Sequence, residues 1–491
     1  ELGMEMTRIV NMNGRNYNTV YQDSDMNDEW LNAYRGVLAD IRAMTPLAEE
    51  AGLTRHIGIA QFIEAYLMVS MVDFFGDVPY SEIVQGEQQN FNPAVDTGAS
   101  IYDACLALID DAIANFNSNP TANPAVDFYY GNDYAKWERA ANTLKLKIYV
   151  QRRLVDSNAA ASFNAIINSG NYIQDTADDF LWRWPATSAT QPDTRHPRYG
   201  ISYQAAGANE YMSNWLMSLM DESADPRTRY YFYRQTNAVP GAEIAPNEEL
   251  LNCSLETPPQ HYIDAGFGGD FCWLPNGYWG RAHGEADGIP PDGLLRAVYG
   301  TYPVGGRFDD DSFLAIGPTA GGNGTGITNL LTAFGVDFMR AEMAMVAGNT
   351  GDARTFMLEG YAKSVAKVQA FLTGREAGAD LSFVPSEGDI NAYATQLGID
   401  FDDADMDGKW DVIGEQYFIA HFGNGVEPYN FYRRTGFPTT LQPNLEPDPG
   451  TFIRSMYYPA NAVNNNSNIS QKPDQTQPVF WDTNPTAPAA N

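Results

Sequence analysis

An apolar run from Ile57 to Phe75 constrains the fold of this chain more than any other stretch. Its apolar residues recur at steps of three and four, which predicts an α-helix. Because they cover most of the helix circumference, we expect this helix to be buried among other helices. A membrane span is the competing interpretation, but Glu64 and Asp73 interrupt the run, and we expect each to find a partner or a narrow solvent-facing stripe. Gly76 and Pro79 predict the end of the helix.

Helical periodicity occurs in two separate blocks of the chain. Further helices are predicted at Asn27–Met44, after Thr97, and at Trp137–Val155, then at Leu330–Val346, Asp352–Leu372 and Trp410–Phe422. From about Asp175 to Thr325, Gly, Pro, Asn, Asp and aromatic residues dominate, and only Asn209–Met220 is clearly helical. The sequence therefore predicts a mainly α fold, in which helix pairs flank an irregular, aromatic-rich middle.

The charge balance excludes one class of partner. The 491 residues carry a formal net charge of −32, and such a surface repels a phosphate backbone. We therefore expect no nucleic-acid partner. Three cysteines are too few for a disulfide framework. Cys105 lies on a helical apolar face and is expected in the core, whereas Cys253 and Cys272 are a possible pair.

Motifs along most of the chain resemble the SusD/RagB family of Bacteroidetes outer-membrane glycan-binding lipoproteins, in its SusD-like branch. They occur in the family's order: FFGDVPYSE, YDACLALIDDAI, WERAANTLKLKIYVQRR, HGEADGIPPDG with YGTYPVGGRFDD, FGVDFMRAEMAMVAGNTGDAR, GEQYFIAHFGNGVEPYNFYRRTGFP, RSMYYP and VFWD. The resemblance implies a fold of TPR-like helix pairs whose long loops form a glycan-binding face. It also implies a cell-surface location at the outer membrane, an N-terminal lipid anchor and a SusC-type TonB-dependent transporter as partner. The chain starts at Glu1 without a lipidation cysteine, so the anchor is implied by the resemblance alone.

One composite domain is expected over residues 1–491. Residues 1–174 and 326–440 would form the helix-pair scaffold, residues 175–325 the variable glycan-binding region, and residues 441–491 an irregular tail.

Aromatic residues in loops are the first candidates for ligand binding. A sugar ring packs its C–H face on an aromatic plane, while its hydroxyls need polar partners. The loop Gly266–Asp287 offers both kinds of side chain, namely Trp273, Tyr278, Trp279, Arg281, His283 and Asp287. The alternative is that a tryptophan pins this loop onto the helices, and a structural role is favoured for His283 because it falls in a family-wide pattern.

Trp182 and Trp184 form a second candidate pair. They alternate with Arg183 as residues of a strand would. The alternative is that the pair caps the core.

The segment Asp403–Asp411 opens like a calcium-binding EF-hand loop, with Asp403, Asp405 and Asp407 at alternate positions before Gly408. The twelfth position is a glycine, however, so an acidic cap of the following helix is the competing interpretation. No other cofactor is expected, and calcium would be structural.

Motifs for catalysis are weak. The sequence contains no G-x-S-x-G and no H-E-x-x-H, and the GGNGTG segment does not follow a convincing strand. We therefore expect a non-catalytic protein that captures a neutral oligo- or polysaccharide and delivers it to the transporter. Among neutral glycans the acidity favours a β-glucan such as laminarin, because an acidic surface suits a marine setting. The alternatives are a glycoside hydrolase on a helical scaffold and a helical-repeat protein-interaction scaffold.

Overall fold

The computed structural model describes residues 1–12, 14–83, 90–187, 193–203, 210–237, 257–268, 274–286, 296–303, 309–317, 321–375 and 381–484. The elements of the first half are α1 (Leu2–Met6), α2 (Tyr17–Val20), α3 (Asn27–Leu31), the π-helix η1 (Asn32–Leu38), α4 (Ala39–Glu50), α5 (Thr54–Phe75), β1 (Val78–Pro79), β2 (Val95–Asp96), α6 (Gly98–Phe116), α7 (Tyr134–Arg152), α8 (Ala159–Ser169), the 3₁₀ turn η2 (Thr176–Asp178), β3 (Phe180–Trp184), α9 (Pro197–Ser202), α10 (Asn214–Glu222), α11 (Thr228–Tyr231) and β4 (Phe232–Tyr233).

The elements of the second half are α13 (Gln260–Asp264), η3 (Pro275–Gly277), β5 (Val298–Tyr299), η4 (Gly321–Gly324), β6 (Gly326–Leu331), α14 (Ala333–Val346), α15 (Thr350–Arg375), η5 (Leu381–Phe383), α16 (Glu387–Asp403), α17 (Met406–Ala420), α18 (Val426–Thr435) and α19 (Ala460–Asn465). The fold is mainly helical, as predicted. Strands occur in the described residues only as three two-stranded antiparallel pairs, β1–β2, β3–β6 and β4–β5.

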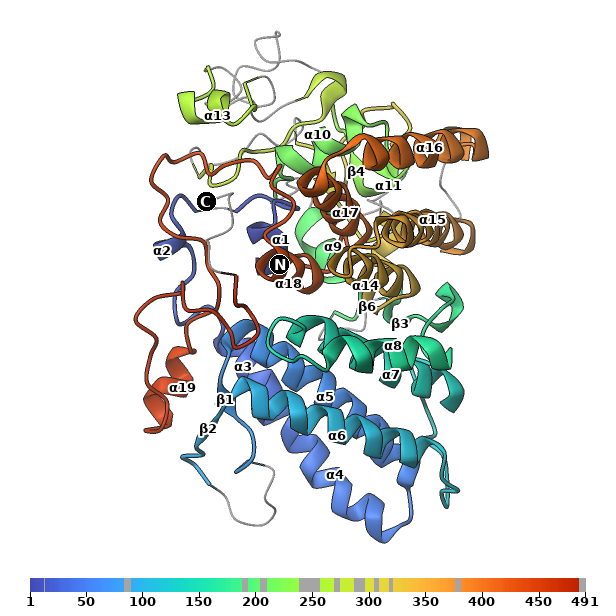
Figure 1. Cartoon of the computed structure of the whole chain (residues 1–491), viewed down its shortest axis with the longest axis vertical. Helices are drawn as coiled ribbons and strands as arrows, with labels where there is room; N and C mark the ends of the chain where they lie inside the picture. Colours follow the sequence, from blue (N-terminus) through green and yellow to red (C-terminus); the bar gives the residue numbers. More distant parts are fainter. Residues whose placement is uncertain are drawn as a thin grey trace.

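Helix α5 is the central helix of the first block. It packs against α4, α6 and α7, which lie around it in the lower half of Figure 1. It is long and apolar enough to cross a membrane by length and composition, but 61% of the most apolar window is buried inside the protein. The prediction of a buried helix over this run is confirmed. The helix ends where predicted, because Gly76 adopts a positive φ of 75° and its N–H bonds to the carbonyl of Val72.

The second block stacks on the first. Helices α14 and α15 form one pair and α16 and α17 another, and α14 contacts α7 of the first block. In Figure 1 the pairs follow one another from α4 and α5 at the bottom to α16 at the top. This succession is the TPR-like arrangement expected from the sequence. The division into scaffold, variable region and tail stays a prediction.

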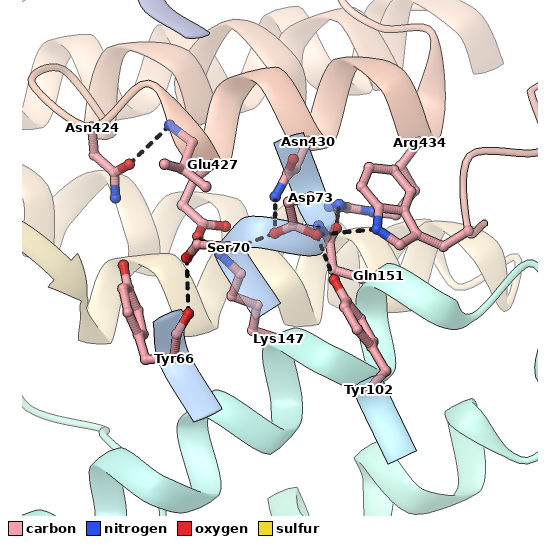
Figure 2. Close-up of polar contacts among 12 residues, drawn as sticks. Tyr66, Ser70, Asp73, Tyr102, Lys147, Gln151, Asn424, Glu427, Asn430 and Arg434 are labelled. Carbon is pink, nitrogen blue, oxygen red and sulfur yellow. Dashed lines mark hydrogen bonds and ion pairs between the residues drawn. The ribbon is translucent and has the colours of Figure 1, made fainter. Parts of the chain in front are cut away.

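The two acids inside α5 both have partners, as predicted. Glu64 accepts a hydrogen bond from the hydroxyl of Tyr80 at 2.9 Å. Asp73 is fully buried and lies at a junction of several elements, shown in Figure 2. Its carboxylate accepts from four side chains, those of Tyr102 (α6), Gln151 (α7), Asn430 (α18) and Trp481 in the C-terminal segment. One side chain therefore joins four helices and the tail.

Buried ion pairs surround this junction. Lys147 lies 3.8 Å from the Asp73 carboxylate and bonds to Glu427. Burial opposes the ionisation of Lys147, but the carboxylates of Glu427 and Asp73 outweigh it and raise its pKa. Arg434 forms a bidentate pair with Glu342 at 2.6 and 2.7 Å, so the pKa of Glu342 is lowered despite its burial. These residues come from α7, α14 and α18, and their pairing fixes the two blocks together.

Sequence periodicity missed several elements. The region predicted as one helix from Leu330 is strand β6 up to Leu331 followed by α14, whose first turn is capped by the Thr332 side chain. Helices α8, α16 and α18 were not predicted. The structure begins α16 with a capping box between Ser386 and Asp389, a signal that the sequence did contain.

Replacing Phe62 by alanine should strongly destabilise the fold. Its side chain is fully buried, with its ring centroid 5.4 Å from that of Trp137 and 5.0 Å from that of Phe180. We expect a loss of about 3–5 kcal/mol in the free energy of unfolding, through lost burial and a residual cavity. Leu67→Ala on the same helix should cost less, because Leu67 is half-buried. Denaturant unfolding measures both, and equal small losses would contradict the buried position of α5.

Stability should decrease with acid because of His421. Burial is the main cause that lowers its pKa from 6.5 to about 4, and its Nδ1 lies 2.9 Å from the carbonyl oxygen of Tyr417. Below pH 6.5 the unfolded chain binds a proton that the folded chain does not, so the stability present above pH 6.5 is lost as pH falls toward about 4. The shift corresponds to on the order of 3 kcal/mol. In His421→Asn this loss is absent, so unfolding free energies at pH 7.5 and 5 should differ less than in the parent. An unchanged difference would contradict a neutral, buried His421.

Candidate functional site

The loop Gly266–Asp287 is largely packed into the protein. Trp279, His283 and Arg281 have relative exposures of 1%, 0% and 2%. These three side chains therefore do not offer the surface platform expected of them, and the alternative that Trp279 pins the loop fits the structure. Trp273 and Asp287 lie outside the described residues, so their ligand-binding role stays a prediction.

His283 connects the loop to both ends of the chain. Its Nε2 lies 3.0 Å from the hydroxyl of Tyr17, and its backbone N–H donates to the side chain of Gln442. Burial, reinforced by the nearby Arg8, holds the pKa of His283 well below its usual range. A neutral, enclosed imidazole is a structural group here, as the sequence pattern had favoured.

Arg281 has a similar structural role. Its guanidinium lies 4.2 Å from the ring centre of Tyr211, and that of Arg296 lies 4.2 Å from the same ring centre. Arg281 also donates to the carbonyl of Glu285 at 3.3 Å. The Arg281 side chain therefore stabilises the conformation of the loop.

Tyr278 is buried too, but it lines a cleft. The cleft has a volume of about 490 Å³ and lies between α10, α11 and the segment before α16. The guanidinium of Arg234 lies 4.9 Å from the Tyr278 ring centre and pairs with Asp309. A role of Tyr278 in ligand binding stays a prediction, now confined to this cleft.

Strand β3 carries the second candidate pair at the surface. β3 pairs with β6, which places Trp182 opposite Thr328 and Trp184 opposite Gly326. Because side chains alternate along a strand, the two indoles share one face, with ring centroids 6.0 Å apart. Both are half-buried, and the Nε1–H of Trp184 donates to Thr328 Oγ1 at 2.9 Å. The predicted strand is confirmed, and the pair both covers the core and remains open on one side.

Phe128 extends this surface and was missed by sequence reasoning. It lies in the segment between α6 and α7, has a relative exposure of 71%, and its ring centroid is 5.8 Å from that of Trp182. Tyr129 packs below, 5.6 Å from Trp182 and stacked on Phe180 at 4.5 Å. We call Phe128, Trp182 and Trp184 the β3 platform. The FYY run next to Asp127 was a sequence signal for aromatic rings between two helices, but it did not indicate which of the three rings is exposed.

The acidic segment at Asp403 is a helix junction. Helix α16 ends at Asp403 and α17 begins at Met406, so the second half of a calcium loop is replaced by helix. The side chain of Asp405 accepts from the N–H of Gly408 at 2.9 Å and caps α17. The ammonium of Lys409 bonds to the carbonyls of Phe401 and Ala404, and a positive charge within this segment disfavours a bound cation.

Metal binding by this segment is thus not supported by its geometry. Asp403, Asp405 and Asp407 do not converge, and the residues that the structure describes contain no group of three or more His, Cys, Asp or Glu side chains placed to hold a metal ion. The competing interpretation of an acidic helix cap fits what is seen.

Of the three cysteines, only Cys105 lies in the described residues, and its predicted position in the core is confirmed. Cys105 is free and buried in the core. Cys253 and Cys272 lie outside the described residues, so their pairing stays a prediction.

Comparison with known proteins identifies the family. A family model described as "Starch-binding associating with outer membrane" matches residues 4–244, and one described as "Susd and RagB outer membrane lipoprotein" matches residues 317–476. No curated protein matches the sequence.

Solved structures share the whole fold. One described as a chitin-binding protein is 21% identical, with 98% of this chain and 94% of that chain covered and a TM-score of 0.67. A chitin-binding SusD homolog from Flavobacterium johnsoniae is 18% identical, with 98% and 93% covered and a TM-score of 0.68. A SusD homolog from Bacteroides fragilis is 16% identical, with 98% and 94% covered and a TM-score of 0.66. At these identities the likeness concerns the fold.

The chain therefore belongs to the SusD/RagB family of outer-membrane lipoproteins. Members of this family are non-catalytic binding proteins of the outer membrane, and the family implies glycan binding and association with a SusC-type protein.

Added calcium should not change the stability of the protein, whereas loss of the Asp405 cap of α17 should lower it. Asp405→Ala removes the acceptor for the Gly408 N–H and should cost about 1 kcal/mol. Asp403→Ala is the matched control, because Asp403 is exposed at the C-terminal end of α16, where an acid is unfavourable to the helix dipole. Melting temperatures with and without EDTA or added calcium should agree. A calcium-dependent rise that Asp403→Ala abolishes would restore the calcium site.

Proposed function

We propose that this protein captures a neutral glycan on the β3 platform and delivers it to a SusC-type TonB-dependent transporter. The observation that carries the residue assignment is the exposed ring of Phe128 beside the half-buried rings of Trp182 and Trp184. Three neighbouring aromatic planes on one surface match the C–H faces of successive sugar rings. The family supplies the class of ligand and partner, and the platform supplies a place for the ligand.

An acidic side chain next to the platform bears on the charge of the ligand. Asp127 precedes Phe128 directly, and its carboxylate accepts from the indole of Trp137 at 2.8 Å. Together with the net charge of −32, this acid disfavours an anionic polysaccharide.

The identity of the neutral glycan is tested by comparing three polymers. The acidity of the chain favours a β-glucan such as laminarin, whereas the matching family model is described by starch and two similar structures by chitin. Retention of the protein in native gels that contain laminarin, soluble starch or a soluble chitin derivative distinguishes them. Strongest retention by laminarin would support the β-glucan.

Phe128→Ala should weaken binding without harming the fold. The ring is exposed, so its removal should change stability by less than about 0.5 kcal/mol. Loss of one stacking plane should cost about 1–3 kcal/mol of binding, by analogy with base–aromatic stacking, which is roughly a fivefold to hundredfold loss of affinity. Trp182→Ala should weaken binding at least as much. Affinity electrophoresis on the retaining polymer measures the effect.

Phe91→Ala is the matched control, because Phe91 is exposed to 75% and has no place in the platform. Retention of Phe91→Ala should equal that of the parent. If Phe128→Ala and Trp182→Ala bind like the parent, or if Phe91→Ala alone loses binding, the platform is not the site. Incubation with the retaining polymer should produce no new reducing ends, and sustained turnover would instead support a glycoside hydrolase.

A further inference from the structure

The loop between α6 and α7 presents Phe128 at the edge of the β3 platform. Its ring has a relative exposure of 71%, so burial in the core does not hold it in place. An exposed ring on a loop without other restraints samples many positions, and fixing it at the moment of binding costs conformational entropy. The contacts that hold the main chain around Phe128 therefore bear directly on the affinity of the platform.

The side chain of Asp127 holds that main chain. Its Oδ1 accepts from the backbone N–H groups of Tyr129 at 2.9 Å and Tyr130 at 3.2 Å. Its Oδ2 accepts from the backbone N–H of Asn132 at 2.9 Å and from the indole N–H of Trp137 at 2.8 Å. Both oxygens are thus engaged within the protein, by three amides of the loop and one side chain of α7.

Trp137 gives this arrangement a fixed point. It is fully buried in α7, and its ring centroid lies 5.4 Å from that of Phe62 and 5.7 Å from that of Phe180. A carboxylate that accepts from a buried indole N–H forms a strong hydrogen bond. Asp127 therefore connects the loop to the core at the residue that directly precedes Phe128.

Other hydrogen bonds close the loop on itself. The side-chain amide of Asn132 donates to the carbonyl of Pro124 at 3.0 Å and accepts from the hydroxyl of Tyr134 at 2.6 Å. Asn132 has a positive φ of 70°, a conformation that asparagine adopts more readily than most residues. The hydroxyl of Tyr130 donates to the carbonyl of Asp178 at 2.8 Å, close to the start of β3. The loop is therefore restrained on both sides of its exposed ring.

These restraints determine where the Phe128 ring lies relative to β3. Its centroid is 5.8 Å from that of Trp182, and Tyr129, whose N–H bonds to Asp127, packs 5.6 Å from the same indole. A shift of the loop would move the Phe128 ring away from the platform, whereas Trp182 and Trp184 would stay on strand β3. The spacing of the three rings thus depends on the conformation of the loop.

We propose that Asp127 is a positioning residue of the β3 platform, which holds Phe128 in the conformation that contacts the ligand. The inference rests on the proposed function of the platform. It predicts that the loop is already formed in the free protein, so that binding does not carry the entropic cost of ordering it. Asp127 acts through Phe128 and need not touch the ligand, since protein donors engage both of its oxygens.

The test compares Asp127→Ala with the parent by affinity electrophoresis, in whichever of laminarin, soluble starch or a soluble chitin derivative retains the parent. We expect Asp127→Ala to lower the affinity at least about fivefold, because the loop must then be ordered on binding. Asp127→Asn keeps one acceptor oxygen and should lose less. In a Phe128→Ala background, Asp127→Ala should have no further effect, because the ring that it positions is gone.

Hydrogen exchange measured by mass spectrometry checks the mechanism without a ligand. Peptides that contain residues 127–132 should exchange faster in Asp127→Ala than in the parent, because three amide groups lose their acceptor. Asp474→Ala is the matched control. It removes a similar turn in the C-terminal segment, where Asp474 accepts from the N–H of Thr476 at 2.9 Å, and it should leave retention unchanged.

Asn132→Gly serves as the second variant if Asp127→Ala does not fold. Glycine accepts the positive φ but makes no side-chain bonds to Pro124 and Tyr134, so this variant should also lower the affinity and speed up exchange in the loop.

The proposal is overturned if Asp127→Ala binds like the parent while Phe128→Ala does not, or if Asp127→Ala weakens binding equally with and without the Phe128 ring. Unchanged hydrogen exchange in Asp127→Ala would also overturn it. Each of these results keeps the proposed function. If neither Phe128→Ala nor Trp182→Ala weakens binding, or if no polymer retains the parent, the proposed function fails and the positioning role fails with it.

Discussion

The buried carboxylate of Asp73 is the interaction on which the rest of the structure depends. An isolated charge at this depth would be costly, and the protein offsets the cost with four side-chain donors and a nearby ammonium group from Lys147. The four donors come from α6, α7, α18 and the C-terminal segment, so the carboxylate is satisfied only when these elements and α5 are all in place (Figure 2). The backbone carbonyl of the same residue accepts from Arg433 of α18 at 2.7 Å. A junction of this kind favours one arrangement of the helices over alternatives that would leave the charge without partners.

The helical scaffold and the candidate ligand surfaces differ in how regular they are. Helix pairs of both blocks are fixed by buried ion pairs such as Arg434 with Glu342, and their apolar residues form one large core. The candidate ligand surfaces lie where this regularity stops. The β3 platform occupies a short strand pair with Phe128 beside it, and the Tyr278 cleft lies next to α10 and α11. Ligand residues on irregular segments, supported by a fixed scaffold, are a common arrangement in binding proteins.

The candidate sites also show how electrostatics selects a ligand. The acidic surface and the carboxylate of Asp127 beside the platform favour uncharged ligands rich in hydroxyl groups. Stacking on aromatic rings supplies affinity that does not depend on charge. The arginines of the loop, by contrast, are used within the fold: Arg281 and Arg296 both contact the ring of Tyr211 and so stabilise the loop itself.

The sequence by itself determined the helices with strong apolar periodicity, the burial of α5, the need of Glu64 and Asp73 for partners, and the family. Such features depend on local patterns of residue type, which survive in any correct fold. The candidate site could be predicted only in part. Trp279 and Trp182 both look like loop or strand aromatics in the sequence, yet one is buried and the other lies at the surface. Which aromatic ring faces water depends on what packs over it from distant parts of the chain. Only the tertiary structure could therefore bring Phe128 next to Trp182 and bury Trp279 in the core.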